Sequence, residues 1–230
     1  MQLRPILSSL RRNKVGATLV ALQIALTLAV LCNAMFIIEE QTARSRAPSG
    51  VADESSVFVI SNQWVGGTDD LAAREQADLA SLRALPEVAD ATLSPSQPLG
   101  GRGMGEDITI HPDRPQSGAL TTVFPVDDHA LNTLGLKLIA GRNFRPDDVQ
   151  IAHGLDDNYA SWGSVIVTRD LARMLEPNGN VLGRVATLRP GNTTATIVGI
   201  VDRFGQSQFS GAGAGGDLSV LAPLLWADSN

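Results

Sequence analysis

The sequence predicts an α+β domain preceded by one apolar helix, and two observations lead to this prediction. Residues 15–38 form a run of 24 residues without a charged side chain, whereas short β-branched and short amphipathic segments alternate through most of the remaining chain. The charge changes at the same place: residues 1–38 carry four basic and no acidic side chains, and residues 39–230 carry 14 basic and 24 acidic ones. The chain therefore contains two chemically different parts.

The composition of the acidic part excludes several classes of protein. Only 4% of the chain is aromatic, and no basic cluster follows the N-terminus, so the sequence is atypical of nucleic-acid-binding domains. The single Cys32 can form neither an internal disulfide nor a thiolate zinc site. Since 43% of the residues are hydrophobic, we expect a folded core rather than disorder.

The apolar run is long enough to cross a bilayer as a helix. At about 1.5 Å per residue it covers roughly 36 Å, against a hydrocarbon layer of about 30 Å. A cleaved signal peptide would have a shorter apolar region followed by small residues, whereas Glu39 and Glu40 follow here directly. The basic residues before the run favour a cytoplasmic N-terminus and an extracytoplasmic acidic part. We therefore predict a basic cytoplasmic segment (1–14), a transmembrane helix (15–38), a stalk and linker (39–50) and an extracytoplasmic domain (51–230).

Small side chains recur along one face of the predicted transmembrane helix, every four residues at Ala17, Ala21, Ala25, Ala29 and Asn33. Small residues let membrane helices approach closely, and polar ones offer hydrogen bonds that lipid does not satisfy. The alternative is that alanine is simply frequent in membrane helices. We favour packing against partner helices in a dimer or a larger complex.

Periodicity and turn residues give the elements of the domain in order. A helix continues from the membrane into the stalk, and Pro48 and Gly50 end it. Alternating or β-branched segments predict strands, and leucine spacing behind acidic residues predicts helices, with Leu71, Leu79, Leu82 and Leu85 on the buried side of the first. Strands are expected at 57–61, 88–94, 107–111, 119–126, 136–140, 165–168, 185–188, 195–201 and 218–225, the seventh and eighth pairing with each other. Helices are expected at 71–85, 129–134 and 169–175, and long loops at 95–105 and 141–163.

The residues that could carry chemistry do not combine into a site. The glycine pattern at residues 211–216 has dinucleotide-binding spacing but lacks a preceding strand and a following helix. The three histidines, His111, His129 and His153, have no metal-ligand spacing. Four acidic pairs could act as acid–base or calcium groups but are more typical of helix caps and polar loops: Asp69-Asp70, Asp127-Asp128, Asp147-Asp148 and Asp156-Asp157. We therefore predict no catalytic residue, no cofactor, no metal and no enzymatic activity.

Several segments, in a fixed order, carry a resemblance to a known family: residues 82–88, 123–126, 134–144, 147–148, 165–173, 182–184 and 196–202. The most specific are Gly141-Arg142-x-Phe144 and the later Val198-Gly199-Ile200-Val201-Asp202. With the basic segment and apolar helix before them, they resemble the periplasmic core domain of MacB-type ABC transporter permeases. We expect Gly141 to turn the chain, and Gly183 and Gly199 to relieve crowding between adjacent strands.

The resemblance implies a mixed-sheet periplasmic domain held in the bacterial inner membrane. It also implies a cytoplasmic ABC ATPase partner, contact with membrane lipid, and motion relayed along residues 15–46 into the periplasm during export or mechanical signalling. Permeases of this type continue into three further membrane helices of the FtsX-like part, so we expect the chain to be a fragment or a split subunit. The alternative function is a single-span anchored binding or scaffold domain without a role in transport.

Overall fold

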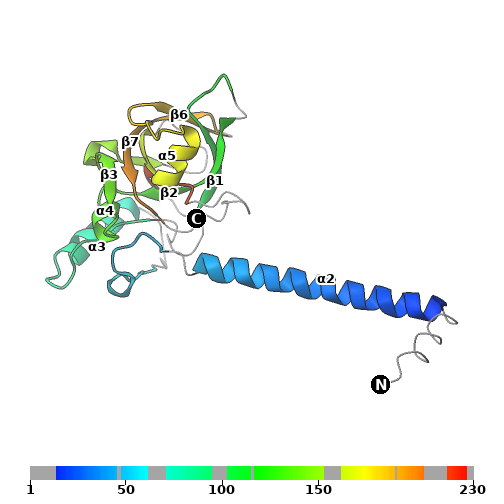
Figure 1. Ribbon diagram of the computed structural model, residues 1–230. Coiled ribbons are helices and arrows are strands. Elements are labelled where there is room, and N and C mark those ends of the chain that lie inside the picture. Colours follow the sequence, from blue (N-terminus) through cyan, green and yellow to red (C-terminus); the bar gives the residue numbers. More distant parts are fainter. Residues whose placement is uncertain are drawn as a thin grey trace. The chain divides into compact units, whose positions relative to one another are not determined.

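The computed structural model describes residues 14–45, 48–61, 71–94, 103–114, 117–152, 162–189, 191–204 and 217–226. The chain divides into two units, Met1–Ala47 and Pro48–Asn230, and each is described by itself (Figure 1).

The first unit contains one continuous helix, α2 (Lys14–Ser45). Its first 29 residues, Lys14–Thr42, are long and apolar enough to cross a membrane, with a mean hydropathy of 2.2. The Thr18 and Thr27 hydroxyls each donate to the carbonyl four residues earlier at 2.8 Å, which satisfies both polar groups within the helix. The helix covers the predicted span and continues through the predicted stalk as far as Ser45.

Six strands of the second unit close into a barrel, with each strand paired to two others in the order β2-β1-β6-β7-β5-β8 and back to β2. The β5–β7 and β2–β8 pairs are parallel and the other four are antiparallel, so the predicted mixed sheet is confirmed. Two short strands extend it, β3 on β7 and β4 on β8. The bounds are β1 Met104–Thr109, β2 Ala119–Val126, β3 Leu138–Gly141, β4 Gln150–Ala152, β5 Gly163–Thr168, β6 Val185–Arg189, β7 Thr193–Val201 and β8 Ser219–Trp226.

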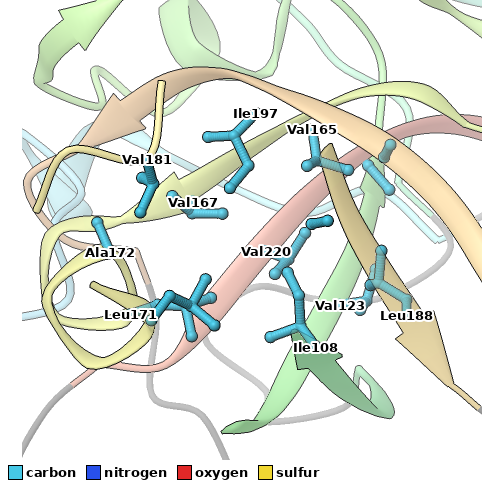
Figure 2. Packing of buried hydrophobic residues seen from close by; sticks show 14 of the residues in the cluster. Ile108, Val123, Val165, Val167, Leu171, Ala172, Val181, Leu188, Ile197 and Val220 are labelled. Atoms are coloured by element: carbon cyan, nitrogen blue, oxygen red, sulfur yellow. The ribbon is translucent and has the colours of Figure 1, made fainter. Parts of the chain in front are cut away.

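The barrel encloses a hydrophobic core, here called the barrel core. Apolar side chains from its strands point inward, together with residues of helix α5 (Arg169–Leu175), which lies across one end of the barrel (Figures 1 and 2). Its members include Ile108, Val123, Val165, Val167, Leu171, Ala172, Val181, Leu188, Ile197 and Val220.

A second core lies on the opposite face of four barrel strands. Side chains alternate between the two faces of a strand, so Phe124, Ile166 and Leu221 point away from their barrel-core neighbours. Helix α4 (Ala130–Thr133) and the segments that flank β3 cover this face. The second core consists of Phe124, Val126, Ala130, Leu131, Leu134, Leu136, Phe144, Ile166, Val201, Phe204 and Leu221.

Two predicted strands are absent from the structure. Residues 57–61 follow a short 3₁₀ turn, η1 (Glu54–Ser56), and form no ladder. Residues 88–94 also form no strand, and side chains bind part of their backbone instead: Leu93 N donates to Asp127 Oδ2, and Arg83 Nη2 donates to Ala91 O. β-Branched composition favours a strand, but a strand also needs a paired edge.

Helix α3 (Leu71–Arg83) is two residues shorter than predicted. Leu79 is buried as expected, but Leu82 is only half-buried and Leu85 is exposed, since the helix ends before it.

Most other predicted elements are confirmed, with bounds that differ by a few residues. Strand β1 begins three residues before the predicted one. The predicted long loop after Gly141 contains a 3₁₀ turn, η4 (Pro146–Asp148), and strand β4. β4 is only three residues long and its sequence lacks alternation long enough to identify it. Strands β6 and β7 pair antiparallel as predicted.

Candidate functional site

The chain enters the second unit through residues 48–57, here called the junction segment. Ser49 is buried, its hydroxyl donates to Glu54 Oε1 at 2.5 Å, and it accepts the Val51 N–H at 3.2 Å. Asp53 then caps η1 by accepting the Ser55 N–H at 3.0 Å. These local bonds fold the junction segment into a compact turn instead of a free linker.

Two glycines let the junction segment approach the backbone of the domain. Gly50 has φ +89°, and a Cβ there would lie 2.2 Å from Arg203 O. Gly135 has φ +60°, and a Cβ there would lie 2.6 Å from the Cβ of Ala52. Between these contacts, Ala52 N donates to Leu134 O at 3.1 Å. We call residues 134–135 and 203–204 the seat of the junction segment. A side chain at Gly50 or Gly135 would push the junction segment away from this seat.

The junction segment also adds apolar side chains to the second core, because Val51 and Val57 pack against it. Leu134, Leu136 and Phe144 of that core belong to the segment of greatest resemblance, residues 134–144. Two of the residues in that segment, Leu134 and Gly135, therefore contact the junction segment directly.

The Gly141-Arg142-x-Phe144 turn is fixed by polar contacts around Asp148. Arg142 Nη1 donates to Asp148 Oδ2 at 2.6 Å, and the Arg145 N–H donates to the same oxygen at 2.7 Å. The Arg142 guanidinium is the main cause that lowers the pKa of Asp148. Asn143 Nδ2 donates to Asp128 O at 2.9 Å, so the turn is also tied to the start of α4.

Two glycine predictions have opposite outcomes. Gly199 does relieve crowding, because a Cβ there would lie 2.5 Å from Arg142 O. The prediction for Gly183 is wrong: its φ is +75° and a Cβ would meet open space, so it is required for a turn. Gly141 turns the chain as expected, with φ +77°.

A second polar cluster ties residues 83–94 to the end of β2. The buried Asp127 carboxylate accepts from Thr92 Oγ1 at 2.5 Å, His129 N at 3.0 Å, Arg83 Nη2 at 3.1 Å and Leu93 N at 3.3 Å. The expectation that Asp127 is a solvated helix cap is therefore only partly correct. Asp127 accepts the His129 N–H just before α4, but it also binds Arg83 and Leu93, which are far away in the sequence.

A half-buried carboxyl group lies beside the seat. Asp217 Oδ2 accepts the Phe204 N–H, and Ser219 Oγ donates to Asp217 Oδ1 at 2.6 Å. Burial is the main cause that raises the pKa of Asp217, to about 6. Neither the seat nor this carboxyl group was identified from the sequence, because both depend on contacts between distant segments; Gly50 and Gly135 were the available signals.

Among the described residues, the structure brings two of the predicted chemical groups together: Asp127 and His129 lie in one polar cluster with Arg83 and Asp90. His129 Nδ1 lies 2.9 Å from Asp90 Oδ1, and His111 Nε2 lies 3.9 Å from Glu176 Oε2. No group of three possible metal ligands occurs among the described residues. Four of the predicted features lie outside those residues: His153, Asp69-Asp70, Asp156-Asp157 and the glycine pattern at 211–216.

An open groove of about 290 Å³ lies along β7 where its edge passes from β6 to β3. It is lined mainly by apolar atoms of Gly141, Arg142, Leu182, Gly183 and residues 196–198. Arg142 is engaged by Asp148, so the groove presents no converging set of polar groups.

Comparison with known proteins identifies the family. The family model of the MacB-like periplasmic core domain matches residues 19–229. No curated protein matches the sequence. Among solved structures, the periplasmic region of MacB from Actinobacillus actinomycetemcomitans is 16% identical with a TM-score of 0.43, and the match covers 64% of this chain and 54% of that one.

Two further structures are similar to the same extent. The extracellular domain of the noncanonic ABC-type transporter YknZ from Gram-positive bacteria is 15% identical, with a TM-score of 0.41 and coverage of 64% and 61%. A domain of a putative permease protein from Porphyromonas gingivalis is 18% identical, with a TM-score of 0.35 and coverage of 63% and 55%. The matched region thus spans little more than half of each of these chains. On the family match, the chain belongs to the MacB-like periplasmic core domain family.

Proposed function

We propose that the chain is the N-terminal, membrane-anchored periplasmic portion of a MacB/FtsX-type permease, in which α2 relays motion to the periplasmic domain. The observation that supports this most is the seating of the junction segment by Gly50, Gly135 and the Ala52–Leu134 hydrogen bond. A relay needs a connection that does not yield when the helix moves, and a segment held by backbone contacts and a hydrogen bond to the domain provides one.

The partners follow from the same proposal. A cytoplasmic ABC ATPase would act through the permease's membrane helices, and α2 would contact lipid and other helices in a homodimer or heteromeric permease. The division into residues 1–14, 15–38, 39–50 and 51–230 is part of the proposal, with a single span of the inner membrane and a cytoplasmic N-terminus. The charge difference between the two sides of the apolar run supports this orientation.

Purification from the native membrane tests the partner. The tagged full chain is extracted in mild detergent, and we expect an ABC ATPase to co-purify. A chain that emerges as a stable monomer without an ATPase would contradict the transporter function and favour the anchored binding or scaffold domain.

Cysteine labelling tests the orientation. In a Cys32→Ser background, the exposed Ser56 is replaced by Cys in one variant and Ser9 in another. We expect a membrane-impermeant maleimide to label the Ser56→Cys variant when supplied from the periplasmic side, and the Ser9→Cys variant only after the membrane is opened. The reverse pattern would overturn the orientation.

Hydrogen exchange tests the relay itself. In the complex with its ATPase, we expect ATP binding to change the exchange of residues 48–57 and to leave strand β6 unchanged. The Gly50→Ala variant should lose this response, whereas Gly183→Ala should keep it, because both glycines have positive φ but only Gly50 lies against a backbone.

A further inference from the structure

Asp217 lies where four parts of the second unit meet. Its carboxylate binds the Phe204 N–H after β7 and the Ser219 hydroxyl of β8. Its backbone N–H donates to Asp170 Oδ2 of α5 at 3.0 Å, and its carbonyl accepts from Thr168 Oγ1 at the end of β5. Through its side chain and its backbone, Asp217 therefore connects the segment after β7 to β5, α5 and β8.

This connection bears directly on the seat of the junction segment. The Phe204 N–H that Asp217 binds belongs to the backbone against which Gly50 packs, since a Cβ at Gly50 would lie 3.2 Å from Phe204 N. The Phe204 ring is fully buried in the second core and meets Phe124 edge-to-face, with ring centroids 4.9 Å apart. A change in the hydrogen bond between Asp217 and Phe204 would therefore act directly on the backbone that Gly50 contacts.

The charges around Asp217 come from the elements that pack against it. α5 provides Asp170, whose negative charge raises the pKa of Asp217, and Arg203 opposes that effect. Arg169 and Asp202 form an ion pair at 2.8 Å. Burial remains the largest effect, and with a pKa of about 6 the carboxyl group changes its charge near neutrality.

We propose that Asp217 is a proton-sensitive clasp that sets how firmly residues 203–204 hold the junction segment. When Asp217 is ionised, the Phe204 N–H donates to a carboxylate, and hydrogen bonds to charged acceptors are shorter and stronger than neutral ones. When Asp217 binds a proton, the same bond becomes a weaker, neutral one and the repulsion from Asp170 disappears. The clasp itself is independent of transport; its effect on the relay rests on the proposed function.

A pH titration of the full chain in lipid nanodiscs, followed by NMR, tests the clasp. We expect the Asp217 side-chain carbon and the Phe204 amide proton to titrate together with a midpoint near pH 6. The amide resonance should move upfield on acidification as its hydrogen bond weakens. Protection of the Ala52 amide, corrected for intrinsic exchange, should fall about fivefold. A Phe204 amide that stays unchanged across the titration would overturn the proposal.

Three variants make the assignment specific. Asp217→Asn should abolish the titration of the Phe204 amide, and the matched Asp202→Asn, which neutralises a nearby carboxylate that makes no bond to Phe204, should leave it intact. If Asp217→Asn does not fold, Asp170→Asn provides the test, because removing the neighbouring charge should lower both midpoints together. A Phe204 titration that persists in Asp217→Asn, or unmoved midpoints in Asp170→Asn, would contradict the clasp. These results do not depend on whether an ATPase co-purifies.

Discussion

The barrel core and the second core share strands β2, β5, β7 and β8 but use opposite faces of them. A continuous set of strand ladders and helix α5 enclose the barrel core. The second core is covered by α4, the residues around β3 and the junction segment, which glycines and side-chain hydrogen bonds hold in place. The comparison indicates that the barrel is the rigid support, and that the second core is where an attached element can act on it.

Phe204→Ala should produce the largest effect that separates the two cores. Removing this fully buried ring should cost about 3–5 kcal/mol, and Leu188→Ala in the barrel core a similar amount. Urea unfolding measures both losses. Only Phe204→Ala should also increase hydrogen exchange at Ala52 under native conditions, because Phe204 belongs to the seat. Equal release of Ala52 in both variants would show that the two cores are not distinct in this way.

Asp127→Ala should also have a large effect, about 2–3 kcal/mol, because it leaves several donors without their buried acceptor. Limited proteolysis should then cut within residues 84–94 while the barrel stays folded. Asp127→Asn is the control: it keeps an acceptor and loses the charge that pairs with Arg83, so it should cost less. Cleavage in the barrel strands before residues 84–94 would contradict this role.

Comparing Gly50→Ala with Gly183→Ala separates the cost of the close backbone contact at Gly50 from the cost of backbone strain. Both positions have positive φ, so each substitution should cost about 1–2 kcal/mol. Gly50→Ala should cost about 1–2 kcal/mol more, because its Cβ would lie 2.2 Å from Arg203 O while the Cβ at Gly183 meets open space. Equal losses of unfolding free energy in chemical denaturation would show that residues 203–204 move aside for the added methyl group at little cost.

The same division explains which features the sequence could predict. Barrel strands such as β2 and β7 are long and apolar enough for their pattern to identify them, and α5 follows from its leucine spacing. The two predicted strands that do not form lie outside the barrel, where residues 57–61 and 88–94 have strand-like composition but no paired edge. Local pattern does not contain the information that a side chain such as Asp127, more than 30 positions away, replaces the ladder.

The seat was predictable only in outline. Resemblance and glycine content drew attention to residues 134–144, and these do support the junction segment. Residues 203–204, which contact Gly50, and Asp217, which binds Phe204, come from the far end of the chain, so these contacts depend on the closed barrel. Positions at which a glycine contacts a distant backbone need the fold before they can be understood.

The smallest effects are expected for two ion pairs of equal length, one beside each core. Arg142–Asp148 holds the turn that carries Phe144 into the second core, and Arg189–Asp107 joins β1 to β6, each with an N–O distance of 2.6 Å. Asp107→Asn should cost less than about 0.5 kcal/mol, because the pair is partly exposed and the β1–β6 ladder remains. Asp148→Asn should cost up to about 1 kcal/mol at neutral pH, since the turn also loses the charged acceptor for the Arg145 N–H.

The pH dependence of the Asp148 contribution has a definite sign. The pKa of Asp148 is lowered in the folded chain, chiefly by the hydrogen bond from Arg142. Its stabilising contribution is therefore complete above the ordinary pKa of the unfolded chain and disappears as the pH falls through the lower folded value. The difference in unfolding free energy between wild type and Asp148→Asn should shrink towards zero in that acidic range, which urea titrations at several pH values measure. A difference that stayed constant would mean that Asp148 acts by shape alone, and that the turn beside the second core does not depend on its charge.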